Sequence, residues 1–181
     1  MSGGSVIAYW AANYFHDFTL HAIVQSMSYA YVRIFNIDAP LIWVLFTLFA
    51  FANPLFLYVW SHLFEKEGPA GNSVRMIYIF VGAFFSLMAV IMQMFDGTRV
   101  IAFIIAFLFM FIPIFSLTYG LLAIMYRDLL AYNVYKVPAY GALNIKAGGM
   151  TIPYFVFSIF FYGALTILID KGFFKRKPKN T

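Results

Sequence analysis

The chain has 181 residues, of which 64% are hydrophobic and only 10% are charged. A soluble domain carries roughly 25% charged residues, so this composition excludes a soluble globular protein and indicates a polytopic membrane protein. The formal net charge is +5, and five of the basic residues lie within positions 171–181. A short basic cluster beside a membrane exit favours binding to anionic lipid headgroups over binding to nucleic acid.

The N-terminal segment SGGSVIAYWAANYFHDF, residues 2–18, has neither the positive n-region nor the plain apolar h-region of a signal peptide. We expect residues 1–17 to form an amphipathic helix at the membrane interface and residues 18–36 to form the first span. A lipid-facing helix would not tolerate the polar side chains of this span, so they are expected to face other helices. They are His21, Gln25, Ser26, Ser28 and Arg33.

Three further segments are apolar over the roughly 20 residues that a membrane crossing needs, namely 40–64, 76–95 and 150–169. Pro54 inside the first of these predicts a helix kink. The sequence EKEGPAGNSVR, residues 65–75, predicts a tight loop in water. The tail, 170–181, is expected to lie in water as a basic anchor. Its basic residues are Lys171, Lys175, Arg176, Lys177 and Lys179.

Residues 99–128 allow two interpretations, because Pro113 lies at the centre of a long apolar segment. The segment is either one kinked span or a re-entrant hairpin that enters and leaves on the same side. Positive-inside counting does not choose, since both interpretations place seven basic residues on the side of the tail and five on the other. The fold class is therefore all-α, with four or five crossings.

The sequence lacks the common motifs for nucleotide binding, metal binding and nucleophilic catalysis. It has no phosphate-binding loop, no zinc-protease motif, no nucleophile elbow and no cysteine. His16 and His21 are five residues apart, which is not the spacing of a helical metal pair. Together with Asp17 they are expected to be polar residues at the mouth of a helix. The Met and Phe side chains of 84–95 and 103–115 predict packing, with a cleft for acyl chains as the alternative.

The N-terminal segment resembles one in the A subfamily of ABC transporters, lipid exporters with the ABC-2 type membrane fold. There, a cytoplasmic segment leads into the third helix of a six-helix half. The matching residues are Ser2, Gly3, Tyr9, Trp10, Asn13, Tyr14 and Asp17. Three later segments resemble that family's fourth helix, its extracellular re-entrant hairpin and the end of its sixth helix. They are PLFLYVWSHLF at 54–64, FIPIFSLTYGL at 111–121 and GALTILIDKGFFKRKP at 163–178.

This resemblance implies that residues 1–181 are a partial ABC-2 type transmembrane domain. It implies four spans, a re-entrant hairpin at 99–128 and cytoplasmic termini. Two helices and an extracellular domain would precede the chain, and a nucleotide-binding domain that binds ATP and Mg²⁺ would follow it. The chain itself would bind no cofactor and catalyse no reaction. One departure is that Gln93 and Met94 stand where the family often has an acidic residue.

The resemblance also implies roles for individual residues. Coupling to the ATPase would use Tyr9, Trp10, Asn13, Tyr14 and Asp17, and a helix kink and gate would use Pro54, Tyr58, Pro113, Phe115 and Gly120. The implied partners are membrane lipids and the remaining parts of the transporter. The alternative is a stand-alone tetraspan protein that acts as an accessory or scaffold subunit. A membrane-embedded enzyme is disfavoured, because the spans carry no deep cluster of His, Asp or Glu.

Overall fold

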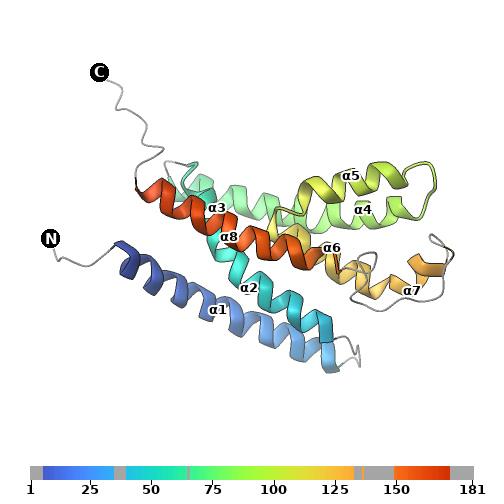
Figure 1. Ribbon diagram of the computed structural model, residues 1–181, viewed down its shortest axis with the longest axis horizontal. Helices are drawn as coiled ribbons and strands as arrows, with labels where there is room; N and C mark the ends of the chain where they lie inside the picture. The colour runs from blue at the N-terminus through green and yellow to red at the C-terminus, as the bar shows by residue number, and fades with distance from the viewer. Residues whose placement is uncertain (1–5, 35–39, 65, 133–135, 137–148, 172–181) are drawn as a thin grey trace, which may run out of the picture.

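The computed structural model describes residues 6–34, 40–64, 66–132, 136 and 149–171, and over these residues it has helices joined by turns and no strand. The helices form an elongated bundle (Figure 1). They are α1 (Val6–Ile34), α2 (Pro40–Ser61), α3 (Glu67–Met76), the π-helix η1 (Ile77–Phe85), α4 (Ser86–Gln93), α5 (Arg99–Phe109), α6 (Pro113–Met125), α7 (Arg127–Leu130) and α8 (Thr151–Asp170). Because α3, η1 and α4 follow one another without a break, we call them together the α3–α4 helix.

Three helices are long and apolar enough to cross a membrane: Leu41–Ser61, Gly68–Gln93 and Thr151–Asp170. They overlap the predicted spans at 40–64, 76–95 and 150–169, although the second helix begins earlier than predicted. α1 is longer, at 29 residues, but it is not among these three, because its polar residues lower its hydropathy.

α1 differs from the prediction in having no boundary at residues 17 and 18. We expected an interfacial helix to end there and a span to begin, whereas one helix runs unbroken from Val6 to Ile34. This stretch contains neither proline nor glycine, so nothing in it interrupts the ladder of backbone hydrogen bonds.

The loop predicted for residues 65–75 is wrong from Glu67 onward, because α3 begins there. Pro69 is the third residue of α3. Proline is compatible with the first turn of a helix, where backbone N–H groups have no partner within the helix. The glycines and the proline that indicated a loop therefore lie in the first turns of a long helix.

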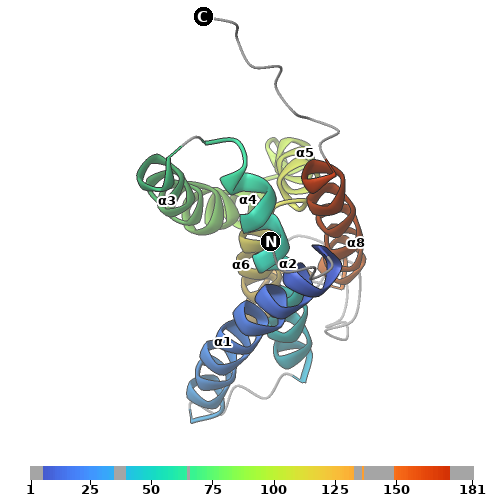
Figure 2. The same cartoon turned by 90° about the vertical axis from the view of Figure 1, so that its left-hand side faces the viewer.

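α2 is the central helix of the bundle, since it packs against α1, α3, α6 and α8. Figure 2 shows it enclosed by these neighbours. Its apolar side chains build one core cluster with Leu117 of α6 and Phe155 of α8. A second cluster lies between α4, α5 and α6, where Ala89, Ala106 and Phe115 are almost completely buried. The small alanines allow these helices to approach closely.

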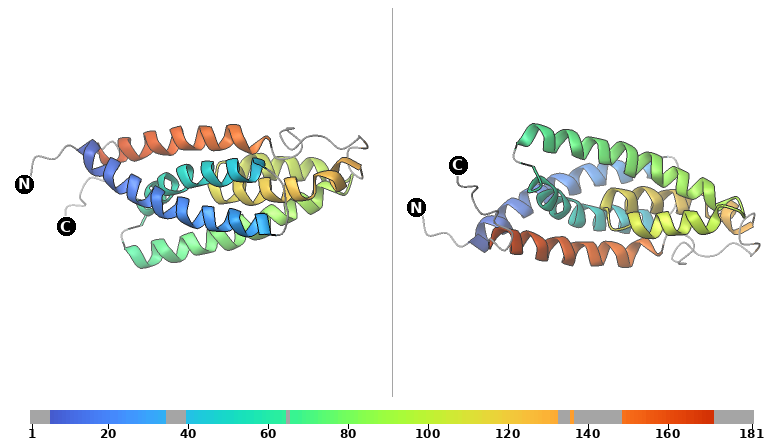
Figure 3. Two further views of the ribbon diagram at one scale, coloured as in Figure 1. Left: turned by 90° about the horizontal axis from the view of Figure 1, so that it is seen from below. Right: turned by 90° about the horizontal axis from the view of Figure 1, so that it is seen from above.

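The start of α1, the start of α3 and the end of α8 lie at one end of the bundle (Figures 1 and 3). α5 enters from the opposite end and α6 returns to it, with the turn between them near the middle of the bundle. α5 has 11 residues and α6 has 13. At 1.5 Å per residue they are about 16 and 20 Å long, well short of the roughly 30 Å hydrocarbon layer.

Side-chain hydroxyls donate hydrogen bonds to the backbone carbonyl oxygens of this turn. The carbonyl oxygen of Phe111 accepts hydrogen bonds from the Tyr162 hydroxyl at 2.9 Å and the Ser158 hydroxyl at 3.3 Å, both on α8. The carbonyl oxygen of Met110 accepts one from Ser116 at 2.7 Å. Non-helical backbone at membrane depth is tolerated only where protein groups pair with it in this way.

The outer surface of the bundle is apolar. In the most apolar part of the α3–α4 helix, and likewise of α8, only 22% is buried inside the bundle. Large side chains such as Phe80, Phe84, Phe107 and Phe160 are exposed on it. Exposed apolar surface of this extent is a lipid-facing surface, so the arrangement is that of a helical membrane protein.

Candidate functional site

The principal candidate site is a cavity of about 700 Å³ between α1, α2 and α8, which we call the α1–α8 cavity. Asp170 and Lys171 stand at the end of α8, and Gly163 lies seven residues deeper, about 10 Å further into the bundle. The lining residues are Trp10, Ala11, Tyr14, Leu55, Tyr58, Gly163, Thr166, Ile167, Asp170 and Lys171.

The α1–α8 cavity is apolar inside and charged at one end. Its walls carry aromatic rings, and the rings of Trp10 and Tyr58 meet with centroids 5.1 Å apart and planes inclined by 58°. Its charged residues, Asp170 and Lys171, both lie where α8 ends. An apolar interior with ionisable groups at one end suits an amphipathic molecule better than an ion or a sugar.

Gly163 leaves the inner part of this cavity open. A methyl group built on Gly163 would meet only Leu55, at 3.8 Å, which is an ordinary van der Waals contact. Alanine would therefore fit at this position, whereas a larger side chain would extend into the cavity.

Hydrogen bonds join α1 to α2 beside the cavity. The Tyr14 hydroxyl donates to the Phe51 carbonyl oxygen at 2.9 Å, and the Tyr58 hydroxyl donates to the Asp17 carboxylate. The structure thus brings together Tyr14 and Asp17, predicted for coupling, with Tyr58, predicted for the kink and gate.

A chain of polar side chains continues deeper in the bundle. The Tyr78 hydroxyl donates to Asn53 Oδ1 at 2.8 Å, and Asn53 Nδ2 lies 2.9 Å from His21 Nε2. His21 Nδ1 lies 2.9 Å from the carbonyl oxygen of Asp17. An amide nitrogen donates and a carbonyl accepts, so these contacts require the neutral Nδ1–H tautomer of His21. We call Tyr78, Asn53 and His21 the polar chain.

Tyr9 and Asn13, which were also predicted for coupling, do not line the cavity. Tyr9 is 65% exposed and contacts the Trp10 ring edge-on. Asn13 is half-buried on α1 and does not line the cavity. Of the basic anchor, Lys171 lines the cavity. The other anchor residues, Lys175, Arg176, Lys177 and Lys179, lie outside the described residues.

The remaining residues predicted for the kink and gate pack in the core and do not line the cavity. Pro54 is buried in α2, which continues through it, and Pro113 is the first residue of α6. Phe115 is fully buried and stacks on Tyr119. A methyl group built on Gly120 would lie 2.9 Å from Leu45 and 3.1 Å from Thr151, so this glycine permits close contact of α6 with α2 and α8.

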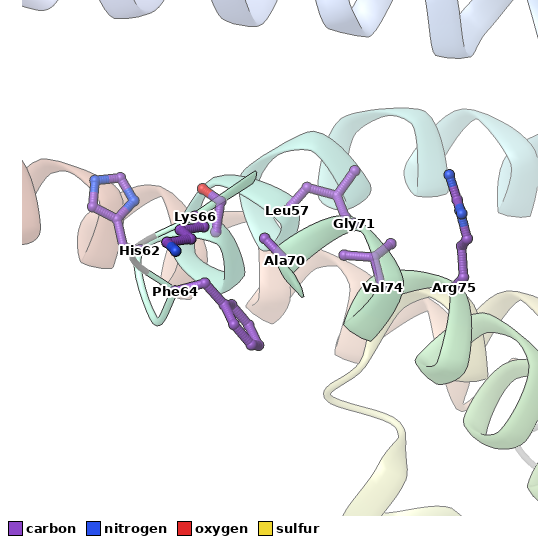
Figure 4. A pocket seen from close by; sticks show the side chains of 9 residues that line it. Leu57, His62, Phe64, Lys66, Ala70, Gly71, Val74 and Arg75 are labelled. Carbon is purple, nitrogen blue, oxygen red and sulfur yellow. The ribbon is translucent and has the colours of Figure 1, made fainter. Parts of the chain in front are cut away.

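A second cavity, of about 750 Å³, lies between the end of α2 and α3 (Figure 4). Lys66 and Arg75 stand apart in it, with apolar side chains such as Val74 between them. Glu65 and Glu67 flank Lys66 in the sequence, so the formal charges of this segment balance.

Sequence reasoning did not single out Asn53 or Tyr78, although an asparagine inside an apolar span is itself a signal for a buried polar contact. In the described part of the chain, no group of three His, Cys, Asp or Glu side chains is placed to hold a metal ion. No protein-family model, curated protein or solved structure matches this chain. The resemblance to the A subfamily of ABC transporters therefore stays a prediction.

Proposed function

We propose that this chain is the transmembrane part of an ATP-driven transporter that moves a lipid or another amphipathic molecule across a membrane. The observation that carries the proposal is the α1–α8 cavity, which is apolar along Leu55 and Ile167 and charged at Asp170 and Lys171. The acyl chain would lie in the apolar interior, and the headgroup would lie at the charged end.

In this proposal α1, α2, the α3–α4 helix and α8 cross the membrane, and α5 with α6 forms a re-entrant hairpin. Both termini lie on the cytoplasmic side. The shortness of α5 and α6 and the pairing of the Phe111 carbonyl with Tyr162 and Ser158 support the hairpin. The start of α1 and the end of α8 lie at the same end of the bundle, which supports an even number of crossings.

Transport would be driven by a nucleotide-binding domain that binds ATP and Mg²⁺ and is not part of this chain. Tyr9, Trp10 and Asn13, near the start of α1, would receive its movement. Trp10 contacts the rings of Tyr58 and His62, with centroids 5.1 and 6.5 Å away, so a shift of α1 would move the wall of the cavity directly.

The test is to isolate the native protein with an antibody raised against the tail sequence KGFFKRKPKNT, residues 171–181. We expect either a band many times larger than 20.7 kDa or a co-purifying ATPase whose activity amphipathic lipids stimulate. A band near 20.7 kDa without any ATPase would overturn the proposal and favour a stand-alone tetraspan protein.

A further inference from the structure

The position of α1 determines the width of the α1–α8 cavity. α1 makes its main helix contacts with α2, and α8 packs against α2 and α6. The two helices that form the opposite walls of the cavity are therefore held through α2 (Figures 1 and 3). Any group that sets the angle of α1 on α2 also sets the space between α1 and α8.

Polar contacts hold α1 against α2 at three levels. Two of them, Tyr14 with Phe51 and Asp17 with Tyr58, involve tyrosines that line the cavity. The third, His21 with Asn53, lies one turn of α1 further from the N-terminal end than Asp17, and neither residue lines the cavity. It is the deepest of the three contacts along α1.

The seam between α1 and α2 is the set of these three contacts. Asn53 differs from its other residues because both its amide nitrogen and its amide oxygen have a partner. It is 1% exposed, its nitrogen contacts His21 on α1, and its oxygen accepts from Tyr78 on η1. One side chain therefore connects three helices at about 12 Å from Ser61, the end of α2. A buried polar group in this setting has no water to replace a lost partner.

The donor and acceptor roles within the polar chain limit the positions that α1 can take on α2. Tyr78 donates to Asn53, Asn53 donates to His21, and His21 donates to the Asp17 carbonyl. Sliding or rotating α1 would leave the Asn53 amide nitrogen or His21 Nε2 without a partner in an apolar environment. Apolar packing alone allows many more relative positions of two helices.

We propose that Asn53 is a positioning residue that holds α1 at the angle that keeps the α1–α8 cavity open, and that Tyr78 supports it from η1. Neither residue touches the cavity. The inference that Asn53 positions α1 does not depend on the proposed function, whereas the expected effect on ligand binding rests on that function.

The first measurement is the distance between α1 and α8. Because the chain has no cysteine, spin labels can be attached at Ala12→Cys and Leu168→Cys, two positions with exposed side chains. We expect Asn53→Leu and His21→Leu to shift or broaden the distance distribution measured by double electron–electron resonance. Tyr78→Phe should do so to a smaller extent, and His21→Gln, which keeps an acceptor, should restore the wild-type distribution.

The second measurement is the affinity for a fluorescent phosphatidylcholine in detergent micelles. Asn53→Leu, which removes both hydrogen bonds of this side chain, should weaken binding by about tenfold. The matched control is Thr118→Val, which removes a hydrogen bond within α6 and leaves the seam between α1 and α2 intact. It should change neither the distance nor the affinity.

The two measurements separate the inference from the proposed function. A changed distance without lipid binding by any variant, wild type included, would support the positioning of α1 and contradict the proposed function. If Asn53→Leu and the control Thr118→Val gave the same α1–α8 distance distribution, the inference would be overturned. A lowered melting temperature with an unchanged distance would also overturn it, since Asn53 would then be a purely structural residue.

Discussion

The hydroxyl of Tyr162 lies 2.9 Å from the carbonyl oxygen of Phe111, 51 residues away in the sequence. Phe111 lies in the turn between α5 and α6, and Tyr162 lies beyond the midpoint of α8. This contact fixes the tip of the α5–α6 hairpin against a helix that is apolar enough to cross the membrane. The hairpin can therefore end inside the bundle without leaving this carbonyl unpaired in an apolar environment.

Removing both donors to this carbonyl is expected to destabilise the bundle. The double variant Tyr162→Phe, Ser158→Ala leaves the Phe111 oxygen without side-chain partners, which costs about 1–3 kcal/mol for a buried acceptor. The melting temperature in detergent should fall more for the double variant than for either single variant. Equal melting temperatures for the wild type and the double variant would show that water or lipid headgroups reach the turn.

The hairpin predicts a particular topology. Gly97, in the turn before α5, and Tyr132, after α7, should both be accessible from the side opposite to His62. Single cysteines at these positions, labelled with a membrane-impermeant maleimide in intact cells, measure this accessibility. Labelling of Gly97→Cys and Tyr132→Cys from opposite sides would instead establish a fifth crossing by residues 99–128.

Gly120 is expected to be intolerant of a side chain. Its added methyl group would lie 2.9 Å from Leu45 and 3.1 Å from Thr151, so Gly120→Ala should overpack the core and cost about 1–3 kcal/mol. Gly71→Ala is the matched control, because nothing lies within 4 Å of the added group and the position is helical. It should stabilise by about 0.4–1 kcal/mol, because alanine restricts the unfolded chain. Thermal unfolding in detergent compares the two variants.

Gly163 tests the α1–α8 cavity directly. Gly163→Leu should fill its inner part and abolish binding of a fluorescent lipid, whereas Gly163→Ala should bind like the wild type because its methyl group meets Leu55 only at 3.8 Å. Equilibrium titration in micelles measures both affinities, and the melting temperature checks that each variant is folded. Equal affinity for Gly163→Leu and the wild type would place the lipid site elsewhere.

The sequence by itself determined the class of protein and the position of three apolar helices. Hydropathy and span length are local properties, so the segments 40–64, 76–95 and 150–169 could be recognised without knowing their neighbours. The start of α3 at Glu67 was missed, because glycine and proline indicate a loop unless the position of Pro69 within the first turn is known. The prediction that the polar side chains of residues 18–36 face other helices holds for His21, which meets Asn53 on α2, whereas Ser26 and Arg33 are exposed.

Only the tertiary structure decided which polar groups pair. Asp17 and Tyr58 are 41 residues apart, and His21 and Asn53 are 32 apart, so no local pattern connects them. The contacts of the Phe111 carbonyl with Tyr162 and Ser158 likewise join residues far apart in the sequence, and no local pattern connects them. A polar group in an apolar environment must find a partner, yet the identity of that partner depends on how distant helices pack.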